Sequence, residues 1–284
     1  TRLTEPHSGS DQTRSGLDCV HKDKGQGRDM RENRLKRLWA AGKAAVNGWC
    51  AIPSSFSAEV MAHQGWDSLT IDLQHGVVDY QAAVPMLQAI STTDCVPLVR
   101  VAWLDPGSLM KALDAGAYGI ICPMINSRQD AELLVSACRY PPLGRRSYGP
   151  VRASLYAGAD YHAHANEAVV VFAMIETREA LDNLEEIAEV EGLDALYIGP
   201  SDLASALGYE PGFDRREPEL VEAIDLVLAR ARERGLVAGI HNGTADYARA
   251  MIEKGFRFVT IGSDARFIAS GAAAILSRMK SQHS

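Results

Sequence analysis

The stretch Val169-Val-Val-Phe-Ala-Met-Ile-Glu176 decides the fold of this 284-residue chain, because seven apolar residues run without a break into a carboxylate. A strand buried on both faces of a parallel sheet has this character, whereas a strand with one exposed face alternates polar and apolar residues. Similar runs recur along the chain: Ala45–Ile52, Ser68–Leu73, Val96–Val101, Gly119–Met124, Ala195–Pro200, Val237–His241 and Phe258–Asp264. The sequence therefore predicts eight parallel strands.

Helix-length segments with a 3.6-residue apolar period separate the predicted strands. The clearest are Tyr80–Ser91, Ser108–Ala115, Asp130–Cys138, Arg178–Val190, Pro218–Arg234 and Ala245–Lys254. Eight β/α units in about 240 residues predict an α/β fold of the (β/α)8 TIM-barrel type. A doubly wound sheet is the competing architecture, but it usually begins with a glycine-rich turn, and Gly25-Gln-Gly27 lies upstream of the first predicted strand.

The composition is that of a globular protein and excludes several classes. Apolar residues make up 46% and charged residues 23%. No apolar stretch reaches the roughly 18 residues that a membrane-spanning helix needs, and a net charge of −7 argues against nucleic acid as a partner. An odd number of widely spaced cysteines indicates reduced thiols and a cytoplasmic protein, without a disulfide framework. These cysteines are Cys19, Cys50, Cys95, Cys122 and Cys138.

Residues 1–29 differ from the rest of the chain. They are rich in Gly, Ser and charged residues, and they contain no apolar leader. Such a segment buries too little apolar surface to offset the entropy of ordering it. We therefore expect residues 1–29 to be a disordered extension or tag, and residues 30–284 to form a single barrel domain that starts near Met30.

A polar or ionisable residue lies at the C-terminal end of several predicted strands. Asp72 and His75 follow the second strand, Arg100 ends the third, Glu176 ends the fifth and Asp202 follows the sixth. Any one of these residues, taken alone, is explained equally well as a helix N-cap or a charged surface residue. Chemistry in (β/α)8 barrels takes place at the C-terminal ends of the strands, so four exits with complementary side chains indicate a functional site.

Glu176 and Asp202 are the most informative pair. The ends of adjacent parallel strands lie about 5 Å apart, so two carboxylates there repel each other unless a cation lies between them. Two carboxylates with water and substrate oxygens suit an octahedral divalent ion such as Mg²⁺ or Mn²⁺. A pair of acid/base carboxylates of the glycosidase type is the alternative.

The remaining strand-end residues suit an anionic substrate. The forked guanidinium of Arg100 can hold a carboxylate or a developing oxyanion, and its alternative role is a salt bridge to one of the carboxylates. Asp72 is placed to orient the His75 imidazole as in acid/base dyads. None of the seven lysines lies at a predicted strand end, so Schiff-base chemistry is disfavoured and metal-stabilised enolate chemistry remains.

Motifs at these positions resemble the HpcH/HpaI aldolase family. They are Ile71-Asp-Leu-Gln-His-Gly76, Pro97-Leu-Val-Arg-Val-Ala-Trp103, Arg139-Tyr-Pro-Pro142, Ile175-Glu-Thr-Arg-Glu-Ala180 and Tyr197-Ile-Gly-Pro-Ser-Asp-Leu203. The resemblance runs from about Leu35 to Ala274, in the family's order and spacing. It implies a class II 2-keto acid aldolase of the 4-hydroxy-2-oxoheptanedioate or hydroxy ketoacid type. Such an enzyme joins the enolate of pyruvate or hydroxypyruvate reversibly to an aldehyde.

The resemblance also implies roles for individual residues. Glu176 and Asp202 would bind Mg²⁺, Mn²⁺ or Co²⁺, Arg100 would clamp the substrate and its enolate, and His75 with Asp72 would form the acid/base dyad. The family forms hexamers, in which Asp114 would reach a neighbouring subunit's site. Backbone amides at the start of the helix after the sixth strand would meet the substrate carboxylate; the residues there are Gly199, Pro200 and Ser201.

Two departures from the family concern the substrate. Gln74 stands where many members that cleave dicarboxylates have an acidic residue, and Met174 stands where they have a glutamine that contacts the keto acid. We therefore expect an altered donor pocket, with the donor and the aldehyde left open. Residues 145–167 are expected to form a loop. Three of its tyrosines either line the aldehyde pocket or pack under the loop: Tyr148, Tyr156 and Tyr161.

Two rival functions remain. One is another metal-enolate lyase on the same barrel, either a CoA-thioester lyase of the citrate-lyase β type or an oxaloacetate decarboxylase. A basic patch for the CoA phosphates would distinguish it, and Arg145-Arg146 is the one candidate. The other is a non-catalytic oligomeric barrel, which the intact set of strand-end residues disfavours.

Overall fold

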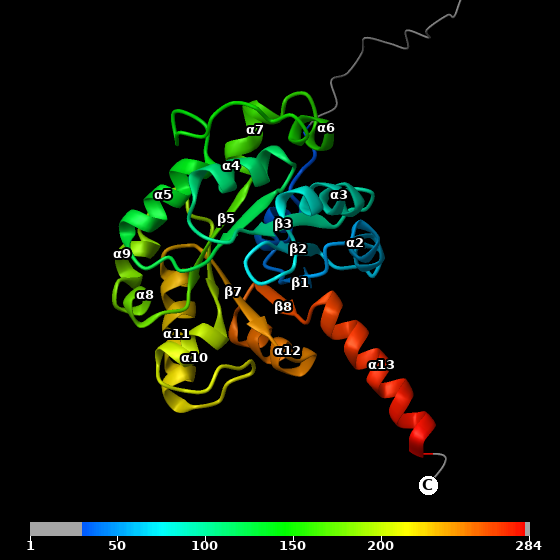
Figure 1. The fold of residues 1–284 in the computed structure, drawn as a ribbon. Helices are drawn as coiled ribbons and strands as arrows, with labels where there is room; N and C mark the ends of the chain where they lie inside the picture. The colour runs from blue at the N-terminus through cyan, green and yellow to red at the C-terminus, as the bar shows by residue number, and fades with distance from the viewer. Residues whose placement is uncertain (1–29, 282–284) are drawn as a thin grey trace, which may run out of the picture.

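Eight parallel strands form one closed barrel in chain order (Figure 1), in a computed structural model that describes residues 30–281. The strands are β1 (Ala45–Cys50), β2 (Ser68–Asp72), β3 (Val96–Arg100), β4 (Gly119–Cys122), β5 (Val170–Ile175), β6 (Ala195–Ile198), β7 (Val237–Asn242) and β8 (Phe258–Ile261). Every predicted run coincides with one of them to within a few residues, β7 extending one residue beyond its predicted run, so the prediction of a (β/α)8 barrel is confirmed. The predicted extension at 1–29 lies outside the described residues.

Helices surround the barrel in the predicted alternation. They are α1 (Arg34–Ala40), α2 (Ser55–Ala62), α3 (Tyr80–Ile90), α4 (Pro106–Asp114), α5 (Arg128–Cys138), α6 (Ala153–Ala157), α7 (Tyr161–Ala168), α8 (Arg178–Asp182), α9 (Leu184–Ala188), α10 (Pro200–Ala206), α11 (Pro218–Glu233), α12 (Ala245–Lys254) and α13 (Asp264–Ser281). The helix predicted over Arg178–Val190 is broken at Asn183. The Asn183 side chain donates to the Asn126 carbonyl at 2.8 Å, a tertiary contact that local periodicity does not reveal.

Aromatic side chains fill the barrel and close its N-terminal end. Phe172, Tyr197 and Phe258 are fully buried between the strands. Trp39 of α1 packs edge-on against Phe172 and Phe258, and its indole nitrogen donates to the Arg257 carbonyl at 2.8 Å. Because this end is plugged, the C-terminal ends of the strands provide the open mouth.

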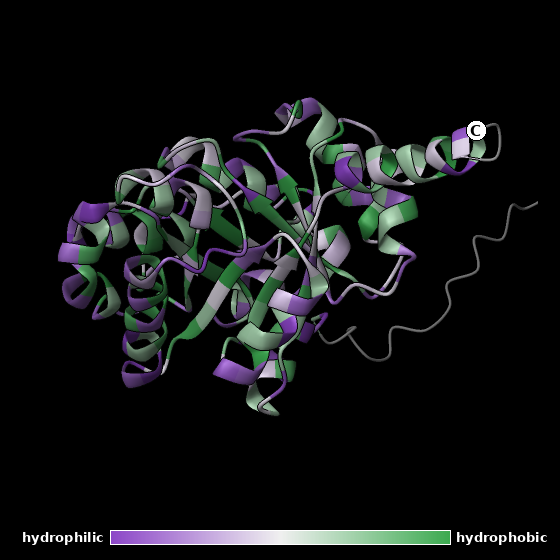
Figure 2. Ribbon diagram, turned by 90° about the horizontal axis from the view of Figure 1, so that it is seen from below, coloured by the Kyte–Doolittle hydropathy of each residue, from purple (hydrophilic) through white to green (hydrophobic). Residues whose placement is uncertain are grey.

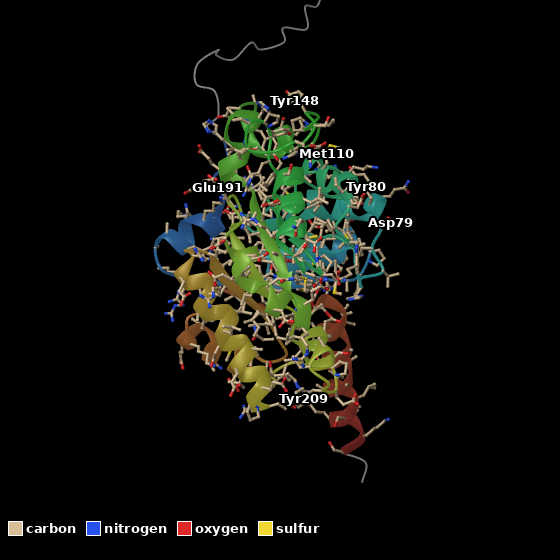
Figure 3. All side chains as sticks on the ribbon, turned by 90° about the vertical axis from the view of Figure 1, so that its left-hand side faces the viewer. Asp79, Tyr80, Met110, Tyr148, Glu191 and Tyr209 are labelled. Atoms are coloured by element: carbon tan, nitrogen blue, oxygen red, sulfur yellow. The ribbon has the colours of Figure 1, made fainter. Side chains whose placement is uncertain are left out.

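The segment from Arg145 to Glu167 lies at the plugged end, because it connects α5 to β5. It was expected to be a loop, but it contains α6 and most of α7. Tyr161 is buried, and its hydroxyl accepts a hydrogen bond from Arg146 at 2.9 Å. Tyr148 is exposed at the end of the molecule far from α13 (Figure 3). Within one chain these tyrosines therefore line no part of the mouth.

Helix α13 projects away from the barrel instead of packing along it (Figure 1). Its apolar side chains are exposed, among them Ile268, Ile275 and Leu276. In Figure 2 the ribbon of this helix carries both green and purple segments, so hydrophobic and hydrophilic residues are interspersed along it. No helix between residues 30 and 281 is long and apolar enough to cross a membrane.

Candidate active site

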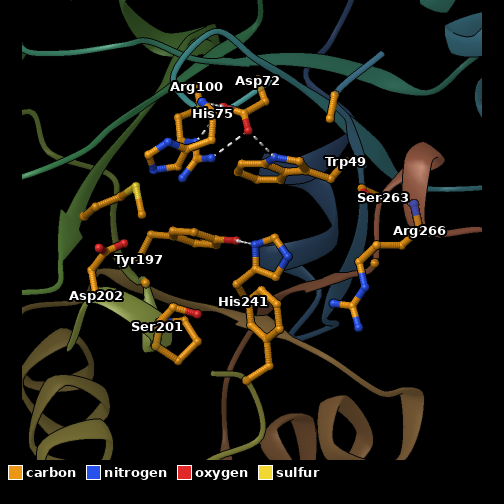
Figure 4. A pocket seen from close by; sticks show the side chains of 16 residues that line it. Trp49, Asp72, His75, Arg100, Tyr197, Ser201, Asp202, His241, Ser263 and Arg266 are labelled. Carbon is orange, nitrogen blue, oxygen red and sulfur yellow. Dashed lines mark hydrogen bonds and ion pairs between the residues drawn. The ribbon is translucent and has the colours of Figure 1, made fainter. Parts of the chain in front are cut away.

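A pocket of about 290 Å³ opens at the C-terminal mouth of the barrel (Figure 4). Most of the residues predicted from the strand ends line it: Asp72, His75, Arg100, Met174, Gly199, Pro200, Ser201 and Asp202. Glu176 is 2% exposed and is not itself a lining residue; its carboxylate lies directly behind Gly199, which does line the pocket. Asp114 and Gln74 are not among the lining residues. The barrel thus brings side chains from β2, β3, β5 and α10 into one cavity.

The backbone around Glu176 is shaped to hold its carboxylate. Its Oε1 accepts a hydrogen bond from the Met124 amide at 2.9 Å, and Met124 has a φ of 57°, in the left-handed region that non-glycine residues rarely adopt. Such strained backbone persists at sites where function requires it. On the other side, a Cβ at position 199 would overlap with Oε2, so any side chain there would force the Glu176 carboxylate to move.

The Glu176 carboxylate is buried with only partial compensation. Burial and the nearby charge of Asp202 raise its pKa to about 7, although the Met124 hydrogen bond and the charge of Arg100 oppose this shift. Asp202 lies in the first turn of α10, exposed to the pocket, where Pro200 starts the helix. Pro200 has no amide hydrogen, so only the amides of Gly199 and Ser201 remain for the predicted carboxylate contact.

The donor set fits a hard divalent cation. Asp202 lines the pocket, the buried carboxylate of Glu176 lies behind Gly199 and within electrostatic reach of Asp202, and Glu176 Oε2 is left without a protein donor among the hydrogen bonds of the described chain. In residues 30–281 no cluster of three or more His, Cys, Asp or Glu side chains is placed to hold a metal. The protein would therefore supply two carboxylates, leaving positions for water and substrate, as is common for Mg²⁺.

Asp72 and Arg100 form a buried bidentate ion pair. Arg100 Nε and Nη2 donate to the two carboxylate oxygens at 2.9 and 2.6 Å, and the Trp49 indole nitrogen donates to Oδ2 at 3.0 Å. The Arg100 guanidinium also lies over the Trp49 ring, 4.8 Å from its centroid. Burial alone would raise the pKa of Asp72, but Arg100 holds it below its usual range. The alternative role considered for Arg100, a salt bridge, is thus present, and it fixes the guanidinium at the pocket.

The link between Asp72 and His75 runs through the backbone. Asp72 Oδ1 accepts from the amides of Gln74 and His75 at 3.0 and 3.2 Å. Within the described residues, the hydrogen bonds of the carboxylate go to these amides, Arg100 and Trp49, and none goes to the imidazole. His75 is exposed at the pocket rim. Its acid/base role stays a prediction, with Asp72 shaping the loop that carries it.

Asp114 lies at the end of α4, away from the pocket. It forms a salt bridge to buried Arg146 at 2.7 Å. Burial raises its pKa, and the Arg146 contact opposes that shift. Its predicted contribution to a neighbouring subunit stays a prediction.

The sequence reasoning missed one wall of the pocket. That wall carries Trp49, Tyr197, Phe213, His241, Ser263 and Arg266. The same rule, that strand ends carry functional residues, would have identified two of these six. His241 is the next-to-last residue of β7, and Ser263 follows β8. Trp49 and Tyr197 lie within apolar runs, where they cannot be told from core residues. Phe213 and Arg266 carry no local signal of a site.

Comparisons with known proteins agree with this geometry. A profile of the HpcH/HpaI aldolase/citrate lyase family matches residues 49–270. The chain is 44% identical over 244 residues to a hydroxypyruvate/pyruvate aldolase of Rhizorhabdus wittichii, covering 86% of this chain and 97% of that one. It is 37% identical over 249 residues to a 4-hydroxy-2-oxo-heptane-1,7-dioate aldolase of Klebsiella pneumoniae, covering 87% and 93%.

A solved structure gives the same result. The crystal structure of a family protein from Burkholderia cenocepacia superposes with a TM-score of 0.82 at 32% identity, covering 88% of this chain and all of that one. The pocket, its strand-end residues and the match across most of the chain lead to one conclusion. This protein belongs to the HpcH/HpaI aldolase/citrate lyase family.

Proposed function

We propose that the protein is a class II aldolase, a carbon–carbon lyase that joins the enolate of pyruvate or hydroxypyruvate reversibly to an aldehyde. The observation that supports this most strongly is that Asp202 and the Asp72–Arg100 ion pair line one small pocket, with the Glu176 carboxylate directly behind Gly199 in its wall. The names of the aligned relatives point to the same reaction. A divalent ion held by Glu176 and Asp202 would act as a Lewis acid on the keto acid and its enolate.

The other residues bind and orient the reactants. Arg100, fixed by Asp72 and Trp49, presents a guanidinium to the keto acid and to the negative charge that develops on the enolate oxygen. His75 at the rim holds or moves the proton exchanged between the donor carbon and the aldehyde oxygen. The amides of Gly199 and Ser201 meet the donor carboxylate at the start of α10.

The donor side of the pocket lacks a directional group at position 174. Met174 is buried, lines the pocket and lies against Gly199. A thioether fills space without specifying a hydrogen-bond partner. We infer that the site orients the donor through the cation and Arg100, and that it accepts a hydroxyl on the donor methyl carbon, as in hydroxypyruvate.

The rival CoA-thioester lyase needs cations for the phosphates of CoA. Among the described residues that line the pocket, the basic side chains besides histidine are Arg100 and Arg266. The rival's candidate pair, Arg145-Arg146, lies at the opposite end of the barrel, where Arg146 is buried against Tyr161. The small pocket therefore favours a keto acid and a short aldehyde.

We further propose a cytoplasmic homo-oligomer, a hexamer as the family resemblance implies. The exposed apolar side chains of α13 lie next to an apolar hollow between α2 and the start of α13, lined by Phe56, Val60 and Trp66. A second copy of this chain would cover both surfaces. The four cysteines in the described part, Cys50, Cys95, Cys122 and Cys138, are free and buried, which fits a reducing compartment.

A screen of substrates tests the proposed reaction. Pyruvate and hydroxypyruvate are each incubated with neutral and anionic aldehydes in Mg²⁺, Mn²⁺ or Co²⁺, and adducts are measured by chromatography. We expect metal-dependent adducts with both donors. A parallel incubation with CoA thioesters tests the rival lyase. No adduct from any aldehyde, with or without cleavage of a CoA thioester, would contradict the proposal.

A further inference from the structure

One wall of the pocket, built from β7, the segment between α10 and α11, and the residues after β8, takes no part in the proposed chemistry. It carries His241, Phe213, Ser263 and Arg266. Figure 4 shows Arg266 and Ser263 across the pocket from Asp202, with His241 between Tyr197 and Arg266. A donor bound at Glu176 and Asp202 would leave this wall to the second substrate.

His241 is held in one orientation by a buried chain of polar groups. Its Nδ1 pairs with the Tyr197 hydroxyl at 3.2 Å, and that hydroxyl donates to Thr260 Oγ1 at 2.8 Å. The Asn47 amide donates to the same Oγ1 at 3.0 Å. Phe213 stacks on the imidazole with ring centroids 4.9 Å apart. The ring therefore has little freedom to turn.

The imidazole presents its second nitrogen to the pocket as an uncharged group. Burial, together with the charges of Arg100 and Arg266, lowers the pKa of His241 to about 3, and the charge of Asp72 opposes this shift. Nδ1 is engaged by Tyr197, so Nε2 is the atom left for a ligand. A hydroxyl group matches Nε2 in either tautomer, because a hydroxyl both donates and accepts.

Arg266 is a cation at the pocket rim without an acidic partner. Its guanidinium lies over the Phe213 ring at 5.3 Å, and in residues 30–281 it forms no salt bridge. The two neighbouring carboxylates are engaged elsewhere. Asp214 accepts from Gly243 and Thr244, and Asp264 accepts from backbone amides and a serine of the β1–α2 segment.

Asp264 also fixes the position of Arg266. Its carboxylate accepts from the Ala51 amide at 2.9 Å and the Ser57 hydroxyl at 3.0 Å, which ties the first turn of α13 to the barrel mouth. The Arg266 amide donates to Ser263 Oγ at 3.3 Å. The guanidinium is thus carried on an anchored turn, although the rest of α13 projects away.

We propose that His241 and Arg266 form the acceptor subsite, which selects a hydroxylated aldehyde that carries an anionic group. His241 pairs with a hydroxyl of the aldehyde, and Arg266 forms an ion pair with its phosphate or carboxylate. This inference rests on the proposed aldolase function and adds the class of the second substrate. Guanidinium groups bind both anions through charge-assisted hydrogen bonds.

Ratios of kcat/KM within each protein test the subsite, because they cancel general losses of activity. With hydroxypyruvate and Mg²⁺, the ratio for glyceraldehyde 3-phosphate over glyceraldehyde reports on Arg266. We expect Arg266→Gln to lower it by about tenfold, as for a charge-assisted hydrogen bond, and Arg266→Lys to lower it less. The ratio for succinic semialdehyde over propanal tests a carboxylate in the same way. A fall in the phosphate ratio alone identifies a phosphate, and a fall in both identifies either anion.

The ratio for glyceraldehyde over propanal reports on His241. We expect His241→Phe to lower it by about three- to tenfold, which corresponds to one hydrogen bond. Arg249→Gln removes an exposed arginine from α12, paired with Asp246, and serves as the matched charge control that keeps every ratio. Unchanged ratios in Arg266→Gln and His241→Phe would overturn the subsite.

A binding measurement separates this inference from the proposed function. Glycerol 3-phosphate cannot react, so calorimetry on the Mg²⁺-loaded protein measures the subsite without turnover. We expect Arg266→Gln to weaken binding by about tenfold relative to Arg249→Gln. Equal binding would overturn the subsite even if the aldolase reaction is confirmed, whereas a loss of binding without any aldol product would count against the proposed reaction alone.

Discussion

The carboxylate of Glu176 depends on two unusual neighbours, a left-handed Met124 and a glycine at 199. A methyl group at 199 would meet Oε2, the oxygen left for a cation. We expect Gly199→Ala to weaken Mn²⁺ binding by about ten- to a hundredfold, the range seen when the surroundings of metal ligands are altered. Calorimetric titration with Mn²⁺ measures this.

Gly271→Ala is the matched control for that variant, because an added Cβ at 271 in α13 meets no atom within 4 Å. It should bind Mn²⁺ like the unaltered protein. Equal Mn²⁺ affinity in both variants would mean that position 199 does not shape the cation site.

His241 makes stability depend on pH. Its pKa is about 3 in the folded protein, so below pH 6.5 the unfolded chain binds a proton that the folded chain does not. Stability is therefore complete above about pH 6.5 and is lost as the pH falls, at up to about 1.4 kcal/mol per pH unit. Urea unfolding between pH 7 and 5 should show a steeper loss in the unaltered protein than in His241→Phe. Parallel curves would show that His241 is not held neutral.

Residue 174 is predicted to affect which keto acid, pyruvate or hydroxypyruvate, the enzyme prefers as donor. Restoring a hydrogen-bonding amide with Met174→Gln should strengthen pyruvate binding by roughly 0.5–1.5 kcal/mol. The ratio of kcat/KM for hydroxypyruvate over pyruvate, with one fixed aldehyde, should change by up to about tenfold in favour of pyruvate. The same ratio in both proteins would show that residue 174 does not select the donor.

At the level of elements, Asp264 joins α13 to the barrel. Its buried carboxylate accepts hydrogen bonds from Ala51, Ile52 and Ser57. Asp264→Ala leaves these donors unsatisfied, and we expect it to lower the free energy of unfolding by about 1–3 kcal/mol in urea titrations. Asp246→Ala removes an exposed carboxylate at the equivalent turn of α12 and is the control. A loss no larger than that of Asp246→Ala would show that the anchor contributes nothing.

The strands could be predicted from sequence because each is buried on both faces, and this burial leaves an unbroken apolar run. The gathering of Glu176, Asp202 and Arg100 at the barrel mouth could be predicted from the rule that strands of such barrels end in functional residues. Contacts between distant segments could not be predicted in this way. Asp72 pairs with Arg100, 28 residues away, and Asn183 breaks a helix by bonding to Asn126. The position of Arg266 likewise depends on the anchoring of Asp264 to the β1–α2 segment.

At the level of the whole molecule, α13 leaves apolar side chains exposed. Ile275 and Leu276 are 66% and 58% exposed. Neighbouring apolar side chains that are this exposed usually mark an interface. If the proposed hexamer forms through α13, Ile275→Glu with Leu276→Glu should convert it into smaller species in sedimentation velocity. Removal of residues 1–29 should leave the hexamer intact and serves as the control. A monomeric unaltered protein would contradict the proposed assembly.

The central claim is that Glu176 and Asp202 hold a divalent ion required for aldol chemistry. The most direct measurement is aldol addition of hydroxypyruvate to an aldehyde by metal-stripped protein, before and after Mg²⁺ or Mn²⁺ is added back, beside Glu176→Gln and Asp202→Asn. We predict no adduct from the stripped protein, full recovery with the metal, and a loss in both variants that the metal does not restore. Full turnover after thorough chelation, or undiminished turnover in Glu176→Gln, would contradict the claim.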